Sequence, residues 1–105
     1  MRLYVPSSIA LLRKWHASGV IPSTDEAFLA EDDAEESEYD ALMAAADASR
    51  ALGATRRVVV VVETPAEGAV PMSDAVAVHA DTADDADDDE EPGWFATQEI
   101  PDLLA

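Results

Sequence analysis

Val58–Val62 (VVVVV) is the stretch that decides the fold of this 105-residue chain. Branched side chains at every position favour a β-strand, and a strand that is apolar on both sides needs cover on both faces of its sheet. We therefore expect this segment to be the central strand, shielded above and below by helices. The polar Glu63 and Thr64 and the following Pro65 would end it.

Outward from the valines, the longest predicted helix precedes them. It begins at Asp32 or Asp33, with acidic residues in its first turn, where the helix dipole favours negative charge. Gly53 would end it. Its apolar residues recur at helical spacing and are Tyr39, Leu42, Met43 and Ala46. A short strand with Phe28 pointing inward is expected before this helix.

A strand followed by a capped helix is predicted at the N-terminus. Leu3–Val5 is apolar and is stopped by Pro6. Ser7 or Ser8 can cap the helix that follows, because a hydroxyl satisfies a free amide of the first turn. Gly19 would end this helix. The side chains that fall on one face of this helix are Ile9, Leu12, Trp15 and His16, with Leu11 beside them.

Two further strands are predicted on the C-terminal side of the valines. In Ala75–Ala80, alternation places Val76 and Val78 on one face. A last strand is expected over Trp94–Ile100, and Pro101–Leu104 is interpreted as a docking turn. Glycine and proline predict a loop over residues 66–74.

The predicted order is β-α-β-α-β-β-(acidic segment)-β, in one domain over residues 1–105. This alternation favours an α/β (or α+β) class, with a small mixed, partly parallel sheet of about four to five strands and two main helices against it. Two helices can leave part of such a sheet uncovered, so a homo-oligomer stays open as an alternative.

The chain is strongly acidic, with 23 Asp and Glu against six Lys and Arg and a formal net charge of −17. The densest run is Asp81 to Glu91, and we predict that 81–92 is a mobile segment because it holds little apolar surface to bury. Such charge repels nucleic acid and anionic membranes and favours a basic protein partner. Mimicry, halotolerance and plain solubility all remain open as reasons for the acidity.

No motif for a reaction is apparent. Cysteine is absent, and the four glycines are isolated, which excludes a phosphate-binding loop and a dinucleotide fingerprint. His16 and His79 stand alone at the edges of predicted elements, and a structural role fits each better than catalysis does. We therefore predict no catalytic residue and no cofactor.

The acidic run only partly matches a calcium-binding loop, so we predict no metal site there. Asp85, Asp87 and Asp89 alternate as in the first half of an EF-hand loop. The sixth position is Glu90 where that loop needs glycine, and the twelfth is Ala96 where it needs glutamate.

The candidate partner contact is the acidic run with the two aromatic residues that follow it. Its residues are Trp94, Phe95, Asp84, Asp85, Asp87, Asp88, Asp89, Glu90 and Glu91. Dense carboxylates can imitate phosphates, and an aromatic side chain can anchor a contact. Trp94 is open to two interpretations, packing under the C-terminal turn or marking a contact site.

Three functions follow from these features. The leading hypothesis is a non-enzymatic small protein that acts through protein–protein contacts. The alternative is an acidic nucleic-acid mimic that inhibits a basic DNA- or RNA-binding protein, and a carboxylate-based hydrolase ranks third. The N-terminus lacks the apolar run of a signal peptide, and no stretch is long enough to span a membrane, so we expect a cytoplasmic protein without membrane contact.

Short motifs spread over nearly the whole chain resemble a known family. They are Met1-Arg-Leu-Tyr-Val-Pro, the Glu38-Tyr39 helix, Arg56-Arg57-Val-Val-Val and Trp94-Phe-Ala-Thr-Gln-Glu-Ile-Pro-Asp-Leu-Leu. The chain looks like the small, acidic, uncharacterised proteins of actinobacteria with an M-R-V-Y-V-P opening and a W-Y/F-x-x-Q-E-L-P-x-L-L ending. That family is a domain of unknown function, so the resemblance implies an α/β class and a cytoplasmic bacterial origin and brings no active site.

Overall fold

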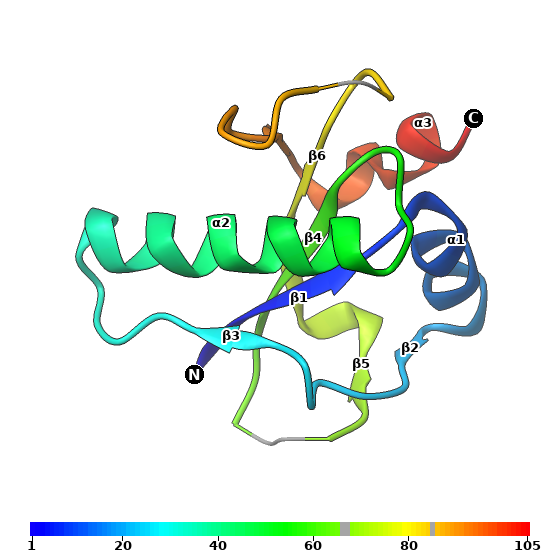
Figure 1. The fold of residues 1–105 in the computed structure, drawn as a ribbon. Coiled ribbons are helices and arrows are strands. Elements are labelled where there is room, and N and C mark those ends of the chain that lie inside the picture. Colours follow the sequence, from blue (N-terminus) through cyan, green and yellow to red (C-terminus); the bar gives the residue numbers. More distant parts are fainter. Residues whose placement is uncertain (66–67, 85) are drawn as a thin grey trace.

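The computed structural model describes residues 1–65, 68–84 and 86–105, and its main feature is a five-stranded sheet in the order β3-β1-β4-β6-β7 (Figure 1). The strands are β1 (Arg2–Ser7), β3 (Phe28–Leu29), β4 (Val58–Glu63), β6 (Ala75–Ala80) and β7 (Gly93–Phe95). Every neighbouring pair is antiparallel. The α/β class is confirmed, but the partly parallel sheet was a wrong prediction.

The reason lies in where β1 inserts. Helix α2 (Glu35–Ala51) connects β3 to β4, and these two strands run in the same direction, as a helical crossover requires. They are not neighbours, because β1 lies between them and is antiparallel to both. The sequence pattern correctly predicted a strand–helix–strand crossover, but it did not indicate that β1 lies between the two strands.

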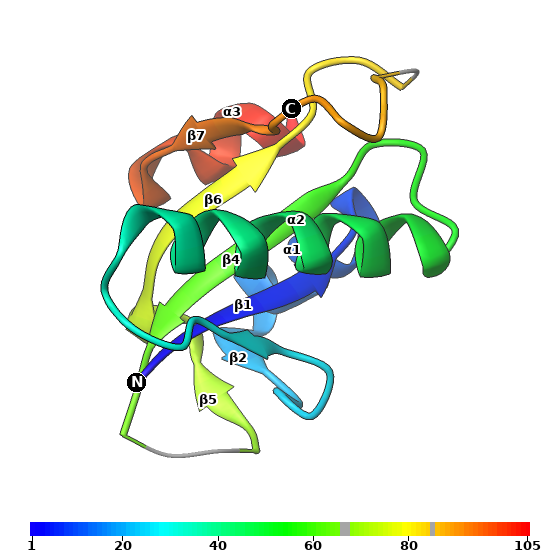
Figure 2. The same cartoon turned by 60° about the vertical axis from the view of Figure 1, so that its left-hand side comes forward.

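The valine run lies on the middle strand, β4, and both its faces are buried, as predicted. On one face, Val59 and Val61 pack with the alanines and Leu42 of α2. On the other, the remaining three valines pack with residues of α1 (Ile9–Ser18) and α3 (Ile100–Leu104). Figure 2 shows α2 in front of the sheet and α1 behind it. The five-residue α3 stands where a docking turn was expected.

Helix α1 has the caps that were predicted, whereas α2 starts later than predicted and has no side-chain cap at its N-terminus. The Ser8 hydroxyl accepts a hydrogen bond from the amide of Leu11 at 3.1 Å, and Gly19 takes a left-handed conformation (φ 77°) after α1. Helix α2 begins at Glu35, later than predicted, because the Asp32 carboxylate holds the preceding residues in a turn. No helix of the described parts is long and apolar enough to cross a bilayer.

Two small features were not predicted. A second sheet pairs β2 (Val20–Ile21) with β5 (Val70–Pro71). β5 lies inside the loop expected over residues 66–74, of which 66–67 are outside the described part. Two 3₁₀ turns, Met72–Asp74 and Thr97–Glu99, precede β6 and α3. Ile21 and Val70 are buried in the core with the valines, which explains why these short strands form.

A bulge in β6 changes which side chains line each face. The pairing of β6 with β4 shifts by one residue between Val61 and Val62, which leaves Val76 as the extra residue. Val78 is buried among the residues under α1, whereas Val76 is exposed on the opposite face of the sheet, the face that carries α2. The prediction that these two valines share a face was therefore wrong.

The last strand is shorter than predicted. β7 ends at Phe95, and the chain then turns into the 3₁₀ segment and α3. Ile100 and Phe95 pack into the core on the α1 side, while Trp94 points to the opposite face. Trp94 and Ile100 therefore do not share one face of a single strand.

Candidate functional site

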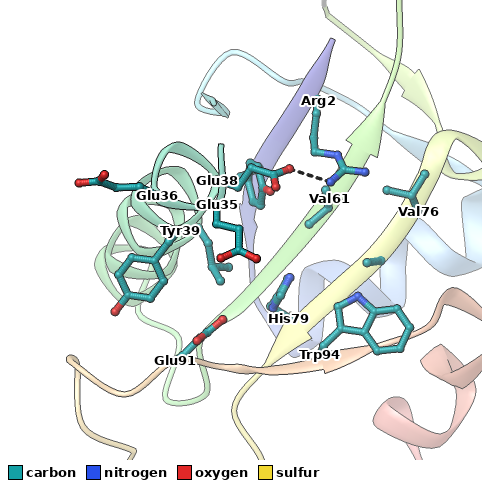
Figure 3. A pocket seen from close by; sticks show the side chains of 13 residues that line it. Arg2, Glu35, Glu36, Glu38, Tyr39, Val61, Val76, His79, Glu91 and Trp94 are labelled. Carbon is teal, nitrogen blue, oxygen red and sulfur yellow. Dashed lines mark hydrogen bonds and ion pairs between the residues drawn. The ribbon is translucent and has the colours of Figure 1, made fainter. Parts of the chain in front are cut away.

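A groove of about 820 Å³ lies over the sheet between α2 and the strands β6 and β7 (Figure 3). Helix α2 packs mainly on β1, β3 and β4, so that on this face the outer part of the described sheet, at β6 and β7, is less covered. The residues that line the groove are Arg2, Tyr4, Glu35, Glu36, Glu38, Tyr39, Leu42, Val61, Val76, Ala77, His79, Glu91 and Trp94. Its floor is mostly apolar, and its two walls carry aromatic rings and carboxylates.

Two aromatic rings stand exposed on opposite walls. Trp94 on β7 is 61% exposed, and its backbone pairs with His79 of β6. Tyr39 on α2 is 45% exposed, although its helical spacing predicted a buried position. Tyr39 lies in the N-terminal half of α2 at the groove wall (Figure 3). A tryptophan this exposed beside an apolar floor is typical of a contact site.

His79 lies in the groove between the two walls (Figure 3). Burial lowers the pKa of its imidazole, and the carbonyl of Pro92, 3.5 Å from Nδ1, and the charge of Glu91 offset only part of that effect. The ring is therefore neutral near pH 7. The other histidine, His16, is exposed at the end of α1 and does not line this groove.

The carboxylates of the groove outnumber its cations. The guanidinium of Arg2 donates to Glu38 at 2.9 Å and to Glu63 at 2.8 and 3.0 Å. The charge of Arg2 is thus already paired with Glu38 and Glu63, away from the middle of the groove. Among the described residues, Glu35, Glu36 and Glu91 have no ion-pair partner. In Figure 3 the Glu35 and Glu91 carboxylates point into the space in front of His79.

The acidic segment itself is attached to a different part of the molecule. Arg57, fully buried at the start of β4, donates two side-chain hydrogen bonds to the buried Asp81 at 2.8 and 2.9 Å. Its backbone amide also donates to Asp81, and its guanidinium reaches the carbonyls of Asp88 and Glu90. Burial would raise the pKa of Asp81, but the hydrogen bonds from Arg57 outweigh it and lower that pKa.

Two more arginines hold the same segment. Arg56 pairs with Asp84 at 3.0 Å, and Arg50 pairs with Asp88 at 3.1 Å. Arg50 also donates to the carbonyl of Ala86. These contacts tie Asp84 and Asp88 to the protein, although both side chains remain largely exposed. The predicted mobility of 81–92 remains a prediction.

The structure therefore divides the nine predicted contact residues. Trp94 and Glu91 line the groove, and Phe95 is half-buried on the opposite face against the core. Five others belong to the acidic segment: Asp84 and Asp88 are paired with arginines, and Asp87, Asp89 and Glu90 are exposed. Asp85 lies outside the described residues.

Sequence reasoning missed the α2 wall of the groove. Glu35 and Glu36 were explained by the helix dipole alone, and Tyr39 by the core stripe. A signal was present in the length of α2, whose acidic first turn extends beyond the short strands it covers. No group of three or more metal-ligating side chains is assembled anywhere in residues 1–65, 68–84 and 86–105.

Comparison with known proteins places the chain in a family. Residues 1–91 match the family of unknown function DUF6912, and the chain belongs to it. The resemblance to a family of unknown function is thereby confirmed. No curated protein and no solved structure matches the chain.

Proposed function

We propose that this protein acts without catalysis, by binding a cationic segment of a partner protein in the groove between α2 and β6–β7. The observation that carries the proposal is the set of groove carboxylates, Glu35, Glu36 and Glu91, which have no ion-pair partner among the described residues and line the same groove as the exposed Trp94. A patch of one charge sign beside an exposed aromatic anchor favours a partner of the opposite sign.

Lysine and arginine side chains match both parts of this groove. Their aliphatic stems can pack on the apolar floor at Val76 and Ala77, while their charged ends reach the carboxylates above it. The face of the Trp94 ring also attracts a cation, by about 0.5–1 kcal/mol at an exposed site. The net charge of −17 adds long-range attraction for any basic partner.

The lining of the groove argues against covalent catalysis. Among the described residues that line it, none is a serine, threonine, cysteine or lysine. The nucleophiles that most often form acyl or Schiff-base intermediates are therefore missing from its walls. The carboxylates and the neutral His79 leave a carboxylate-based hydrolase as the third hypothesis, behind binding.

The nucleic-acid mimic is the weaker alternative because arginines engage much of the acidic segment. Asp81, Asp84 and Asp88 each accept hydrogen bonds from an arginine of the chain. A mimic needs charges that no cation of the chain neutralises, and this role would fall mainly to Asp87, Asp89 and Glu90. A cytoplasmic location of the protein and its partner rests on sequence features alone.

The test compares two double variants of equal charge. A fluorescein-labelled peptide of alternating lysine and valine serves as the cationic probe, and one of alternating glutamate and valine as its control. Glu35→Gln with Glu91→Gln should weaken binding of the cationic peptide about 3- to 30-fold, measured by fluorescence anisotropy at low salt. Asp87→Asn with Asp89→Asn should change it less than twofold.

A second variant tests the aromatic anchor. Trp94→Ala should reduce the affinity about 30-fold, as expected for a central aromatic contact worth about 2 kcal/mol. Equal binding of both peptides, or a loss caused only by the Asp87 and Asp89 substitutions, would overturn the groove as the site. The second result would support the mimic instead.

A further inference from the structure

We infer that the cationic segment docks as an extended strand that pairs with the outer edge of β7, an inference that rests on the proposed function. β7 is the terminal strand of the five-stranded sheet and, within the described parts of the chain, pairs only with β6. In an antiparallel ladder, half of the backbone groups of a strand face away from its neighbour. No described residue bonds to the outward backbone groups of Gly93–Phe95.

The side chain of Trp94 connects β7 to the groove. Trp94, the middle residue of β7, projects its ring onto the groove face, as Figure 3 shows. A strand added to this edge would lie about 4.8 Å away and place every second side chain on that face. Those side chains would contact Trp94 and come within reach of Glu91, which is separated from the first residue of β7, Gly93, by Pro92 alone.

The charges beside β7 select the kind of strand. Exposed sheet edges are usually protected by lysine or by proline on the strand, and the one lysine of this chain, Lys14, is on α1. Glu90 and Glu91 stand next to the edge of β7 and are exposed. A second copy of the chain would bring a charge of −17 to the same place, so self-pairing is opposed and a cationic strand is favoured.

The opposite edge of the sheet provides an internal control. It is formed by β3, which has two residues, and it lies at the far end from the groove. Strand addition guided by the groove should therefore occur at β7 and leave β3 unchanged. Because three residues offer only two or three backbone hydrogen bonds, Trp94 must supply much of the affinity.

N-methylation of the peptide backbone separates strand pairing from simple groove binding. Two versions of the lysine–valine peptide are made, one N-methylated at the lysines and one at the valines, so that each blocks the amides of one strand edge. Pairing with β7 predicts about tenfold weaker binding for one version and less than threefold for the other. Equal effects in both versions, with binding still dependent on Trp94, would overturn strand pairing and leave the groove proposal standing.

Amide hydrogen exchange with the unmodified peptide gives a second readout. Binding should slow the exchange of outward-facing amides in Gly93–Phe95 severalfold and leave Phe28–Leu29 unaffected. Protection at β3 instead of β7 would overturn the inference. If the unmodified peptide does not bind at all, the proposed function fails, and this result is distinct from a failure of strand pairing alone.

Discussion

The carboxylates of the segment 81–88 and those of the groove differ in what faces them. Asp81, Asp84 and Asp88 are paired with arginines, one of them deep in the protein. Glu35 and Glu91 point into the groove with no cation against them among the described residues. The acidity of the chain thus serves two purposes, attachment of a segment in one region and a free negative surface in the other.

The arginines explain this division. All five donate to a carboxylate or a backbone carbonyl of the chain itself; they are Arg2, Arg13, Arg50, Arg56 and Arg57. With one lysine besides, the chain has almost no cation left to neutralise its remaining acids. Any further positive charge must come from a partner or from salt.

The largest expected effect comes from the buried pair. Arg57→Met should lower the free energy of unfolding by about 3–5 kcal/mol, because Asp81 is left buried without its cation. Arg56→Met, which breaks an exposed pair, should cost at most about 1 kcal/mol. Urea unfolding monitored by circular dichroism measures both. Equal losses of unfolding free energy in the two variants would contradict the prediction that the buried pair contributes more than the exposed one.

Acid should act through the same pair, with a smaller effect. The pKa of Asp81 is lowered in the folded state, so its contribution to stability is complete above the unfolded value near 3.9 and is lost as the pH falls through the folded value. We expect the urea midpoint to drop below about pH 4. Asp81→Asn should be less stable at pH 7 and should lose part of this acid dependence; an identical pH profile in both proteins would contradict the assignment.

An unpaired carboxylate of the groove should matter for binding and hardly at all for stability. Glu91→Gln should change the free energy of unfolding by no more than about 0.5 kcal/mol, since no ion pair is broken and some repulsion is relieved. The same substitution should weaken binding of the lysine–valine peptide about twofold to fivefold, measured by anisotropy. A marked loss of stability would remove the distinction between the two sets of acids.

The smallest effect concerns His79. Burial lowers the pKa of His79, so protonation occurs below its usual value near 6.5 and places a cation in front of Glu35 and Glu91. That cation competes with the peptide, so the affinity should fall about twofold to fivefold between pH 7 and pH 5. His79→Gln should remove this dependence. Peptide binding by the variant that still weakens as strongly would exclude His79 as the cause.

The lowered pKa of His79 also makes the stability of the fold depend on pH. Because the folded state disfavours the charged imidazole, His79 destabilises the fold as the pH falls below the unfolded value near 6.5. His79→Gln should therefore show a flatter dependence of the urea midpoint between pH 7 and pH 5 than the parent protein.

Much of the fold could be predicted because its signals are local. The hydroxyl of Ser8, the glycines after both long helices and the uninterrupted valines each determine the backbone around them. The direction of neighbouring strands is not local. The strand direction depends on the position of β1 between β3 and β4, and no local sequence pattern indicates that position.

The groove was less predictable than the fold for a similar reason. Its exposed valine results from a bulge, and Val76 has the sequence context of an ordinary alternating strand. Tyr39 has correct helical spacing for the core and still lies beside the groove. Trp94 and Glu91 were identified because they are adjacent in sequence to the acidic run, which is itself held elsewhere by arginines.

The buried valines of β4 also matter before folding is complete. Five uncharged valines are the kind of segment that stacks between identical chains when it is exposed on a nascent polypeptide. β1 leaves the ribosome ahead of β4, but β6, its other neighbour, follows later, so one side of the valine strand waits unpaired. Arg56 and Arg57 before it and Glu63 after it place charges at both ends, where gatekeeper residues oppose aggregation. The guanidinium that is buried in the finished protein therefore also protects the chain while it is being made.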